Sequence, residues 1–153
     1  MLKIPHTAYV ALRLHGEETY PHECCGVLLG RFEEDGTKTV TGAVRCSNVN
    51  ADSPQSRYRI DPKELICIQR EGRELGEEVV GFYHSHPDHP PEYSVTDLEE
   101  AHWIGCSYVI TSVLAKRAEI TRAFALSGNG EEDKQFLEEK IAINEPPFIE
   151  ETG

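Results

Sequence analysis

Residues 84–97 read His-Ser-His-Pro-Asp-His-Pro-Pro-Glu-Tyr-Ser-Val-Thr-Asp, and this stretch contains a compact set of metal-binding side chains. Alternate residues of a β-strand point to the same face, so a strand that ends here can aim the imidazoles of His84 and His86 at one point. Ser94 and Asp97 then have the spacing of a helix N-cap and its third-position acid. Imidazole and carboxylate are both zinc ligands. The stretch therefore predicts a zinc site formed by His84, His86 and Asp97, with the rest of the chain as its scaffold.

The segments on either side of this stretch predict a domain of mixed helices and strands. Asp35-Gly36 is a hairpin turn signal between two strand-like runs. Asp61-Pro62 combines a helix cap with a proline suited to the first helical position. The segment 134–143 reads as a strand by its alternation, although a helix remains an alternative there. The pattern predicts helices over 5–20, 61–75 and 94–104, strands over 24–32, 37–44, 79–86, 106–113, 119–126 and 134–143, and a loop over 46–59.

Length and composition indicate one soluble domain. The chain has 153 residues, of which 39% are hydrophobic and 27% charged, and such a chain can bury a core without disulfide or metal staples. We expect a domain over 1–143, followed by an acidic tail over 144–153. No apolar run approaches the roughly 20 residues of a membrane helix, and the N-terminal residues lack the pattern of a signal peptide.

Cysteine usage and charge bear on compartment and partner. The five cysteines are an odd number without a C-x-x-C motif, so we expect them to be reduced and the protein to be cytoplasmic. With 15 basic and 27 acidic residues the formal charge is −12, which repels a phosphate backbone. The sequence therefore predicts no nucleic-acid partner and no membrane, and it favours a protein or peptide as partner.

A zinc ion with three protein ligands keeps its fourth position for water, as catalytic zinc sites do. Zinc lowers the pKa of that water to about 7, so the zinc-bound water would be the nucleophile. A base must then take the proton and return it to the leaving group, and a glutamate with a raised pKa suits this task. Glu23 is a candidate because it immediately precedes the apolar run 24–32, a strand that could lie beside the histidine strand. Ser94 could donate its hydroxyl to an oxyanion.

Two longer motifs give the chain a family resemblance. The first is Pro-His-Glu-Cys-Cys-Gly-Val-Leu-Leu-Gly at 21–30, and the second combines His-Ser-His-Pro at 84–87 with Ser-Val-Thr-Asp at 94–97. Together they resemble the JAMM (MPN-plus) zinc metallopeptidase family in its compact prokaryotic form. The hairpin after Gly30 and the segment 57–62 extend the resemblance over nearly the whole chain. Tyr93 stands where the family often has proline, which affects the expected shape of the loop.

The resemblance implies a fold, a set of roles and a reaction. The fold would be α+β, MPN/JAB-like and cytidine-deaminase-like, with a curved, mostly antiparallel sheet wrapped on a helix and flanked by other helices. His84, His86 and Asp97 would bind one Zn²⁺. Glu23 would be the general acid and base, and Ser94 would stabilise the oxyanion. The reaction would be hydrolysis of the peptide or isopeptide bond after the C-terminal glycine of a small ubiquitin-like protein, a sulfur carrier or modifier that ends in Gly-Gly.

Each motif also has a plainer interpretation. A His-x-His pair on a strand is usually structural, Ser94 and Asp97 are explained as a capping box, and Glu23 as a solvated acid at a strand edge. His22, Asp88 and His89 are expected at the surface or beside the site. Cys24 and Cys25 are expected to be a small core residue and its neighbour rather than a nucleophile, since no His or Asn partner is indicated.

Other protein classes fit less well. A nucleobase deaminase would need a Pro-Cys-x-x-Cys motif, which the sequence lacks. A barrel amidohydrolase would need about 250 residues. A non-catalytic scaffold of the same fold that binds a protein partner would be expected to have lost a ligand or the glutamate. Since all of them are present, the sequence favours an enzyme, and it leaves the oligomeric state open, a homodimer included.

Overall fold

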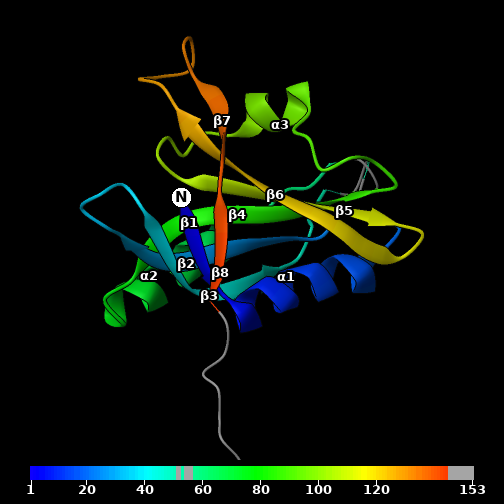
Figure 1. Ribbon diagram of the computed structural model, residues 1–153, viewed down its shortest axis with the longest axis horizontal. Coiled ribbons are helices and arrows are strands. Elements are labelled where there is room, and N and C mark those ends of the chain that lie inside the picture. Colours follow the sequence, from blue (N-terminus) through cyan, green and yellow to red (C-terminus); the bar gives the residue numbers. More distant parts are fainter. Residues whose placement is uncertain (51–52, 54–56, 145–153) are drawn as a thin grey trace, which may run out of the picture.

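The computed structural model describes residues 1–50, 53 and 57–144, which form one eight-stranded sheet and three helices (Figure 1). The chain order is β1 (Leu2–Pro5), α1 (His6–Thr19), β2 (Cys25–Phe32), β3 (Lys38–Cys46), α2 (Pro62–Glu74), β4 (Glu78–Pro87), α3 (Val95–Glu100), β5 (Ser107–Leu114), β6 (Arg117–Ser127), β7 (Gln135–Glu139) and β8 (Ile141–Asn144).

The strands follow the order β7-β6-β5-β4-β2-β3-β1-β8, and four of the seven pairings are antiparallel. The predicted α+β class with a mostly antiparallel sheet is therefore confirmed. β7 and β8 lie at opposite ends of this order, although only Lys140 separates them in the chain. Glu139 of β7 forms an ion pair with Lys38 of β3 (3.2 Å). The sheet therefore curls until its two ends approach each other.

Alternate residues of the central strands face two separate cores. On β2, Val27 and Leu29 belong to one core and Leu28 to the other, as the period of two requires. Leu12 of α1 packs with Leu28, whereas Ile68 of α2 packs with Val27. α1 contacts strands from both halves of the sheet, namely β8, β1, β3, β4, β5 and β6, so the sheet curves around this helix. Figure 1 shows α1 and α3 on opposite sides of the strands.

A close approach between neighbouring strands fixes α1 relative to β4. A Cβ atom at Gly26 would lie 2.1 Å from a ring carbon of Tyr83, so only glycine leaves room for this ring. The Tyr83 hydroxyl lies 2.7 Å from Nδ1 of His15 in α1. The buried ring thus connects β2, β4 and α1.

Most predicted elements are confirmed, among them the hairpin of β2 and β3 and the helix cap at Asp61, whose side chain accepts from the Lys63 amide. Three predictions need correction. The four-residue strand β1 was not predicted, because so short a segment shows no clear alternation. The segment 134–143 forms two strands rather than one, because the chain crosses at Lys140 between the two ends of the sheet. α3 ends at Glu100 instead of 104, since the chain turns inward and buries Ala101.

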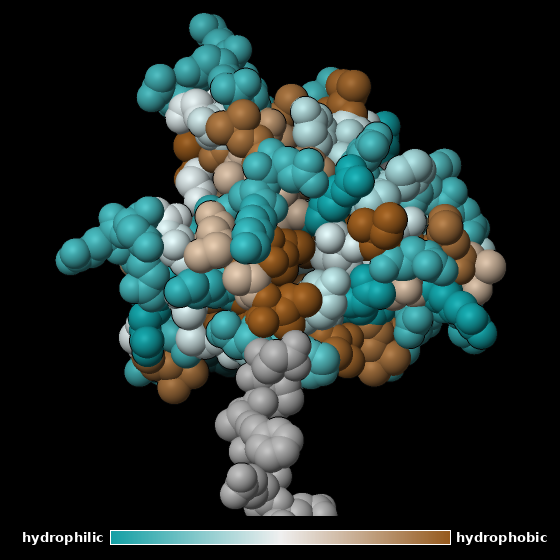
Figure 2. Space-filling model, in the orientation of Figure 1, coloured by the Kyte–Doolittle hydropathy of each residue, from teal (hydrophilic) through white to brown (hydrophobic). Residues whose placement is uncertain are grey.

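Two further observations concern the surface and the tail. Hydrophilic side chains cover much of the face in Figure 2, and the apolar residues there form separate groups. No helix in the described ranges is long and apolar enough to span a membrane. β8 includes Asn144, the first residue of the predicted tail. The rest of that tail, residues 145–153, and part of the predicted loop 46–59 lie outside the described residues.

Candidate metal centre

The two histidines lie at the end of a central strand, as predicted. β4 pairs with β2 on one side and β5 on the other, and His84 lies opposite Cys25 of β2. Because β2 runs antiparallel to β4, the residues just before Cys25 lie beside the end of β4. The Cys24 amide donates to Oγ of Ser85 (2.8 Å) and ties the two strands together there. This pairing brings Glu23 to the histidines, which sequence spacing alone could not establish.

The start of α3 supplies a carboxylate to the same point. The Asp97 amide donates to Oγ of Ser94 (3.0 Å), and the Ser94 amide donates to Oδ2 of Asp97 (2.8 Å). The predicted capping box is therefore confirmed. Since the cap fixes the Asp97 side chain to the helix backbone, the carboxylate is held in one orientation toward β4.

Three ligand-type groups converge at this point. The Nε2 atoms of His84 and His86 are 3.2 Å apart, and they lie 3.3 and 3.1 Å from Oδ1 and Oδ2 of Asp97. Ligands about 2.0–2.1 Å from a tetrahedral zinc are separated from one another by about 3.3 Å. Glu23 lies at the edge of the same cluster, with a carboxylate oxygen within 4.8 Å of both histidine ligand atoms. The donor set and its spacing fit zinc.

Neighbouring groups orient the imidazoles. Nδ1 of His86 lies 2.9 Å from the Pro90 carbonyl oxygen, so this nitrogen donates a hydrogen bond and leaves Nε2 facing the cluster. The ring of Tyr58 stacks on His84 with centroids 4.5 Å apart. Sequence reasoning assigned no role to either neighbour. Pro90 acts through its backbone, which leaves no side-chain signal, and Tyr58 is recognisable only once its ring is seen on His84.

The pKa values of the two acids, Glu23 and Asp97, are shifted in opposite directions. Burial raises the pKa of Glu23 to about 8, an effect that His86 opposes and the Asp97 carboxylate reinforces. Burial alone would also raise the pKa of Asp97, but hydrogen bonds from His84 and His86 outweigh it and hold that pKa well below its ordinary range. In the metal-free protein these shifts favour the ionised form of Asp97 and the protonated form of Glu23 at neutral pH.

The histidines differ as well. Burial lowers the pKa of His84 more than Asp97 raises it, so this imidazole is neutral at pH 7. Burial also lowers the pKa of His86, but Asp97 and the Pro90 carbonyl more than compensate, and the net shift is upward. Two buried polar atoms, Oε2 of Glu23 and Nδ1 of His84, have no hydrogen-bond partner among the described residues.

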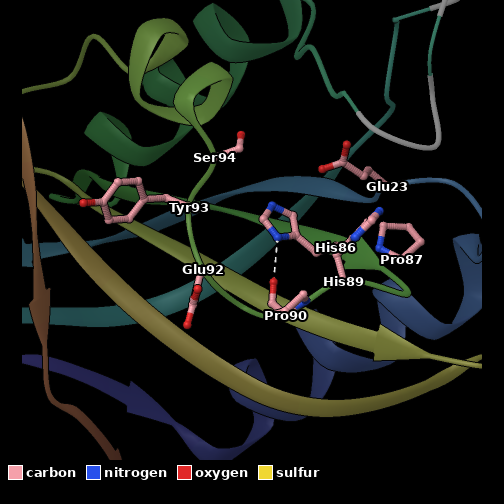
Figure 3. Close-up of a pocket in the computed structure, with 8 residues that line it drawn as sticks. All are labelled: Glu23, His86, Pro87, His89, Pro90, Glu92, Tyr93 and Ser94. Carbon is pink, nitrogen blue, oxygen red and sulfur yellow. Dashed lines mark hydrogen bonds between the residues drawn. The ribbon is translucent and has the colours of Figure 1, made fainter.

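A hollow of about 370 Å³ opens beside the cluster (Figure 3). Glu23, His86 and Ser94 all border it, together with the proline-containing loop that links β4 to α3. Tyr93 extends away from His86 (Figure 3) and packs against Phe124 at a centroid distance of 5.2 Å. The aromatic residue that departs from the usual proline therefore anchors the loop to the sheet.

The structure places the remaining sequence candidates around this centre. His89 borders the hollow, and His22 borders a second hollow on the other side of Glu23. Cys24 and Cys25 are buried, as predicted, and burial raises the pKa of both thiols far above the ordinary value, which makes them poor nucleophiles. All five cysteines are described, and none forms a disulfide.

Comparison with known proteins gives a consistent result. The sequence model of a family described as prokaryotic homologs of the JAB domain matches residues 5–127. A desampylase of Haloferax volcanii is 45% identical over 92 residues, which are 60% of this chain and 63% of that protein. A probable TtuB-protein conjugate cleaving protease of Thermus thermophilus is 33% identical over 107 residues, 67% of this chain and 65% of that one. The matches thus span less than two thirds of these relatives.

Solved structures agree on the fold. A solution structure of a protein from Desulfitobacterium hafniense superimposes with a TM-score of 0.80 at 26% sequence identity. It covers 95% of this chain and 94% of that one.

Proposed function

Because the chain belongs to the family of prokaryotic homologs of the JAB domain, we propose that it is a zinc-dependent peptidase or isopeptidase. Its substrate would be a small ubiquitin-like protein, a sulfur carrier or modifier, cut after its C-terminal glycine. The names of the two relatives support this class of substrate, since one is a desampylase and the other is named for cleaving protein conjugates.

One geometric observation carries the proposal: the ligand-type atoms of His84, His86 and Asp97 converge at one point, and the buried carboxyl group of Glu23 lies beside them. Asp97 is ionised and contacts both imidazoles, which suits a metal ligand. Glu23 is buried, has a free carboxylate oxygen among the described residues and has a pKa of about 8, which suits a general acid and base at neutral pH. Pairs of acids with pKa values pushed apart are typical of active sites that use one as acid or base.

In this mechanism His84, His86 and Asp97 would hold one zinc ion. Zinc supplies the Lewis acidity that makes water nucleophilic at neutral pH. In its ionised form Glu23 accepts a proton from the attacking water, and the protonated carboxyl then delivers that proton to the leaving nitrogen when the carbon–nitrogen bond breaks. The Ser94 hydroxyl accepts from the Asp97 amide through its oxygen, so its own hydrogen is free to donate to the oxyanion.

The hollow beside His86 gives the substrate tail a place. We assign the extended Gly-Gly end of the ubiquitin-like protein to this hollow, where Pro87 and Pro90 form part of the wall. Residues with larger side chains in place of the two glycines should be cleaved poorly. Since none of the cysteines is paired, we propose a cytoplasmic location.

The test uses a ubiquitin-like protein that ends in Gly-Gly and is joined by an isopeptide bond to a lysine-containing reporter peptide. Mass spectrometry of the products should show cleavage after the last glycine by the zinc-loaded protein. Glu23→Gln should keep its zinc but lose a factor of about 10² to 10⁴ in rate, the usual contribution of general acid–base catalysis.

The matched control is Glu18→Gln, which makes the same chemical change on an exposed glutamate of α1 that pairs with Arg45. It should cleave at the natural rate. A Glu23→Gln variant as fast as the natural chain would remove Glu23 from the mechanism. A natural chain with full zinc and no cleavage of any ubiquitin-like conjugate would instead favour a scaffold that binds a protein partner.

A further inference from the structure

The carboxyl group of Glu23 is positioned by its backbone rather than by its own hydrogen bonds. Its side chain is 2% exposed, yet Oε2 has no hydrogen-bond partner within the described ranges. A carboxyl group that must take and release a proton is best left without permanent donors. Its distance from the reacting atoms then depends on how firmly the segment 20–24 is held.

The C-terminal end of this segment is attached to the histidine strand. The Cys24 amide donates to Oγ of Ser85, and the Ser85 amide donates to the Cys24 carbonyl (3.3 Å). On the other side, the Asn48 side chain donates to the Glu23 carbonyl (3.3 Å). These contacts fix Glu23 from Cys24 onward. On the α1 side, the His22 amide donates to the Thr19 carbonyl (2.8 Å) and the Thr19 hydroxyl donates to the His22 carbonyl (3.0 Å), which holds His22 to the helix but not to the strand that carries the histidines.

The N-terminal end is attached through Tyr20 and Asp88. The Tyr20 hydroxyl donates to Oδ2 of Asp88 (2.5 Å), and Oδ1 of Asp88 accepts from the Ala115 amide (3.0 Å). The Asp88 amide donates to the Val113 carbonyl (2.7 Å). Asp88 directly follows β4, the strand that carries His86. It therefore connects this strand both to the end of α1 and to the turn between β5 and β6.

Asp88 has an unusual backbone conformation that places its carboxylate between Tyr20 and the Ala115 amide. Its φ is 57°, in the left-handed region that non-glycine residues seldom adopt. In this conformation both carboxylate oxygens are occupied, one by the hairpin turn and one by Tyr20. The hydrogen bonds compensate for the unfavourable φ.

We propose that Tyr20 and Asp88 form a positioning pair that holds Glu23 in place for proton transfer, an inference that rests on the proposed function. Neither side chain borders the hollow beside His86, and neither belongs to the metal cluster. The pair therefore acts on the proton-transfer step through the segment 20–24, without contacting substrate or metal. Its loss should lower kcat while KM and the zinc content stay unchanged.

The principal variant is Tyr20→Phe, which removes one hydroxyl and keeps the ring. Because a displacement of about 1 Å in a catalytic group can cost a factor of about 10² in rate, we expect kcat to fall by about 10-fold to 100-fold. The matched control is Tyr9→Phe in α1, the helix that Tyr20 directly follows, since the Tyr9 hydroxyl makes no hydrogen bond within the described part of the chain. It should behave like the natural chain.

A double-mutant cycle separates the pair from other effects of Asp88. Asp88→Gly tolerates the positive φ and removes both side-chain contacts. If the pair acts as a unit, adding Tyr20→Phe to Asp88→Gly should cause no further loss of kcat. Independent, multiplicative losses would overturn the pairing.

Hydrogen exchange gives a readout that does not require hydrolysis. In the zinc-loaded natural protein the amides of the segment 20–24, to which Pro21 contributes none, should be protected, above all those of His22 and Cys24, which donate hydrogen bonds. Tyr20→Phe should accelerate their exchange on the order of tenfold, and other peptides should be unaffected. Faster exchange with an unchanged kcat in an active enzyme would overturn the positioning role. Unchanged exchange would show that the pair does not hold the segment 20–24 and would overturn the proposal. This result can be read even if the natural chain cleaves no conjugate, so a failure of the proposed function is distinguishable from a failure of the positioning pair.

Discussion

Replacing Glu23 by glutamine should raise the free energy of unfolding of the metal-free protein, and the gain should grow with pH. The side chain is 2% exposed and its pKa is raised from 4.5 to about 8 by burial. Between these two values the native state holds a proton that the unfolded chain releases. The free energy of unfolding therefore falls as pH rises from about 4.5 to about 8. Above pH 8 the whole loss is present, and below pH 4.5 Glu23 causes no loss. Glutamine has no such titration.

The size of the effect follows from the two pKa values. Each pKa unit corresponds to about 1.4 kcal/mol, so the full penalty of the ionised carboxyl approaches about 5 kcal/mol above pH 8. Between pH 5 and pH 8, the difference in unfolding free energy between Glu23→Gln and the natural chain should increase by about 3 kcal/mol. This is a large part of the stability of an ordinary domain.

The assay is urea unfolding in the presence of a chelator, followed by the fluorescence of Trp103, at several values of pH from 5 to 8. Glu18→Gln again serves as control. A hydrogen bond from Arg45 lowers the pKa of Glu18, so this carboxylate stabilises the fold at high pH, and its removal should have the opposite sign. A Glu23→Gln curve that stays parallel to that of the natural chain over the whole range would refute the argument that burial keeps this carboxyl protonated.

Three further predictions follow from the geometry. Asp97→Ala should lower the zinc content measured by metal analysis, because it removes one of the three converging ligands; an unchanged content would exclude Asp97 as a ligand. Zinc affinity measured by competition with a chromophoric chelator should weaken as pH falls through the raised pKa of His86, since protons compete with zinc for this imidazole, and an affinity independent of pH would contradict this. Gly26→Ala should cost about 3 kcal/mol in unfolding free energy through its clash with Tyr83, whereas Gly42→Ala, where an added Cβ meets nothing within 4 Å, should cost much less.

The parts of the fold that could be predicted are those governed by short-range rules. The β2–β3 hairpin depends on Asp35-Gly36, and α2 depends on the cap at Asp61. The cap at Ser94 likewise specifies α3 and the orientation of Asp97 within four residues. The parts that could not be predicted depend on distant partners. β1 exists because it pairs with β3 and β8, and the break at Lys140 reflects closure of the sheet.

For the candidate site, the sequence by itself determined which ligand-type residues are available and how two of the three reach one point. His84 and His86 share a face because strands have a period of two, and Asp97 is held by its own helix cap. Family resemblance named Glu23, but only the tertiary structure decided its environment. Pairing of β2 with β4 joins Cys24 to Ser85, 61 positions further along the chain. Burial raises the pKa of Glu23 there, and hydrogen bonds from His84 and His86 lower the pKa of Asp97. No local sequence pattern encodes this difference, because it depends on residues that are distant in the chain.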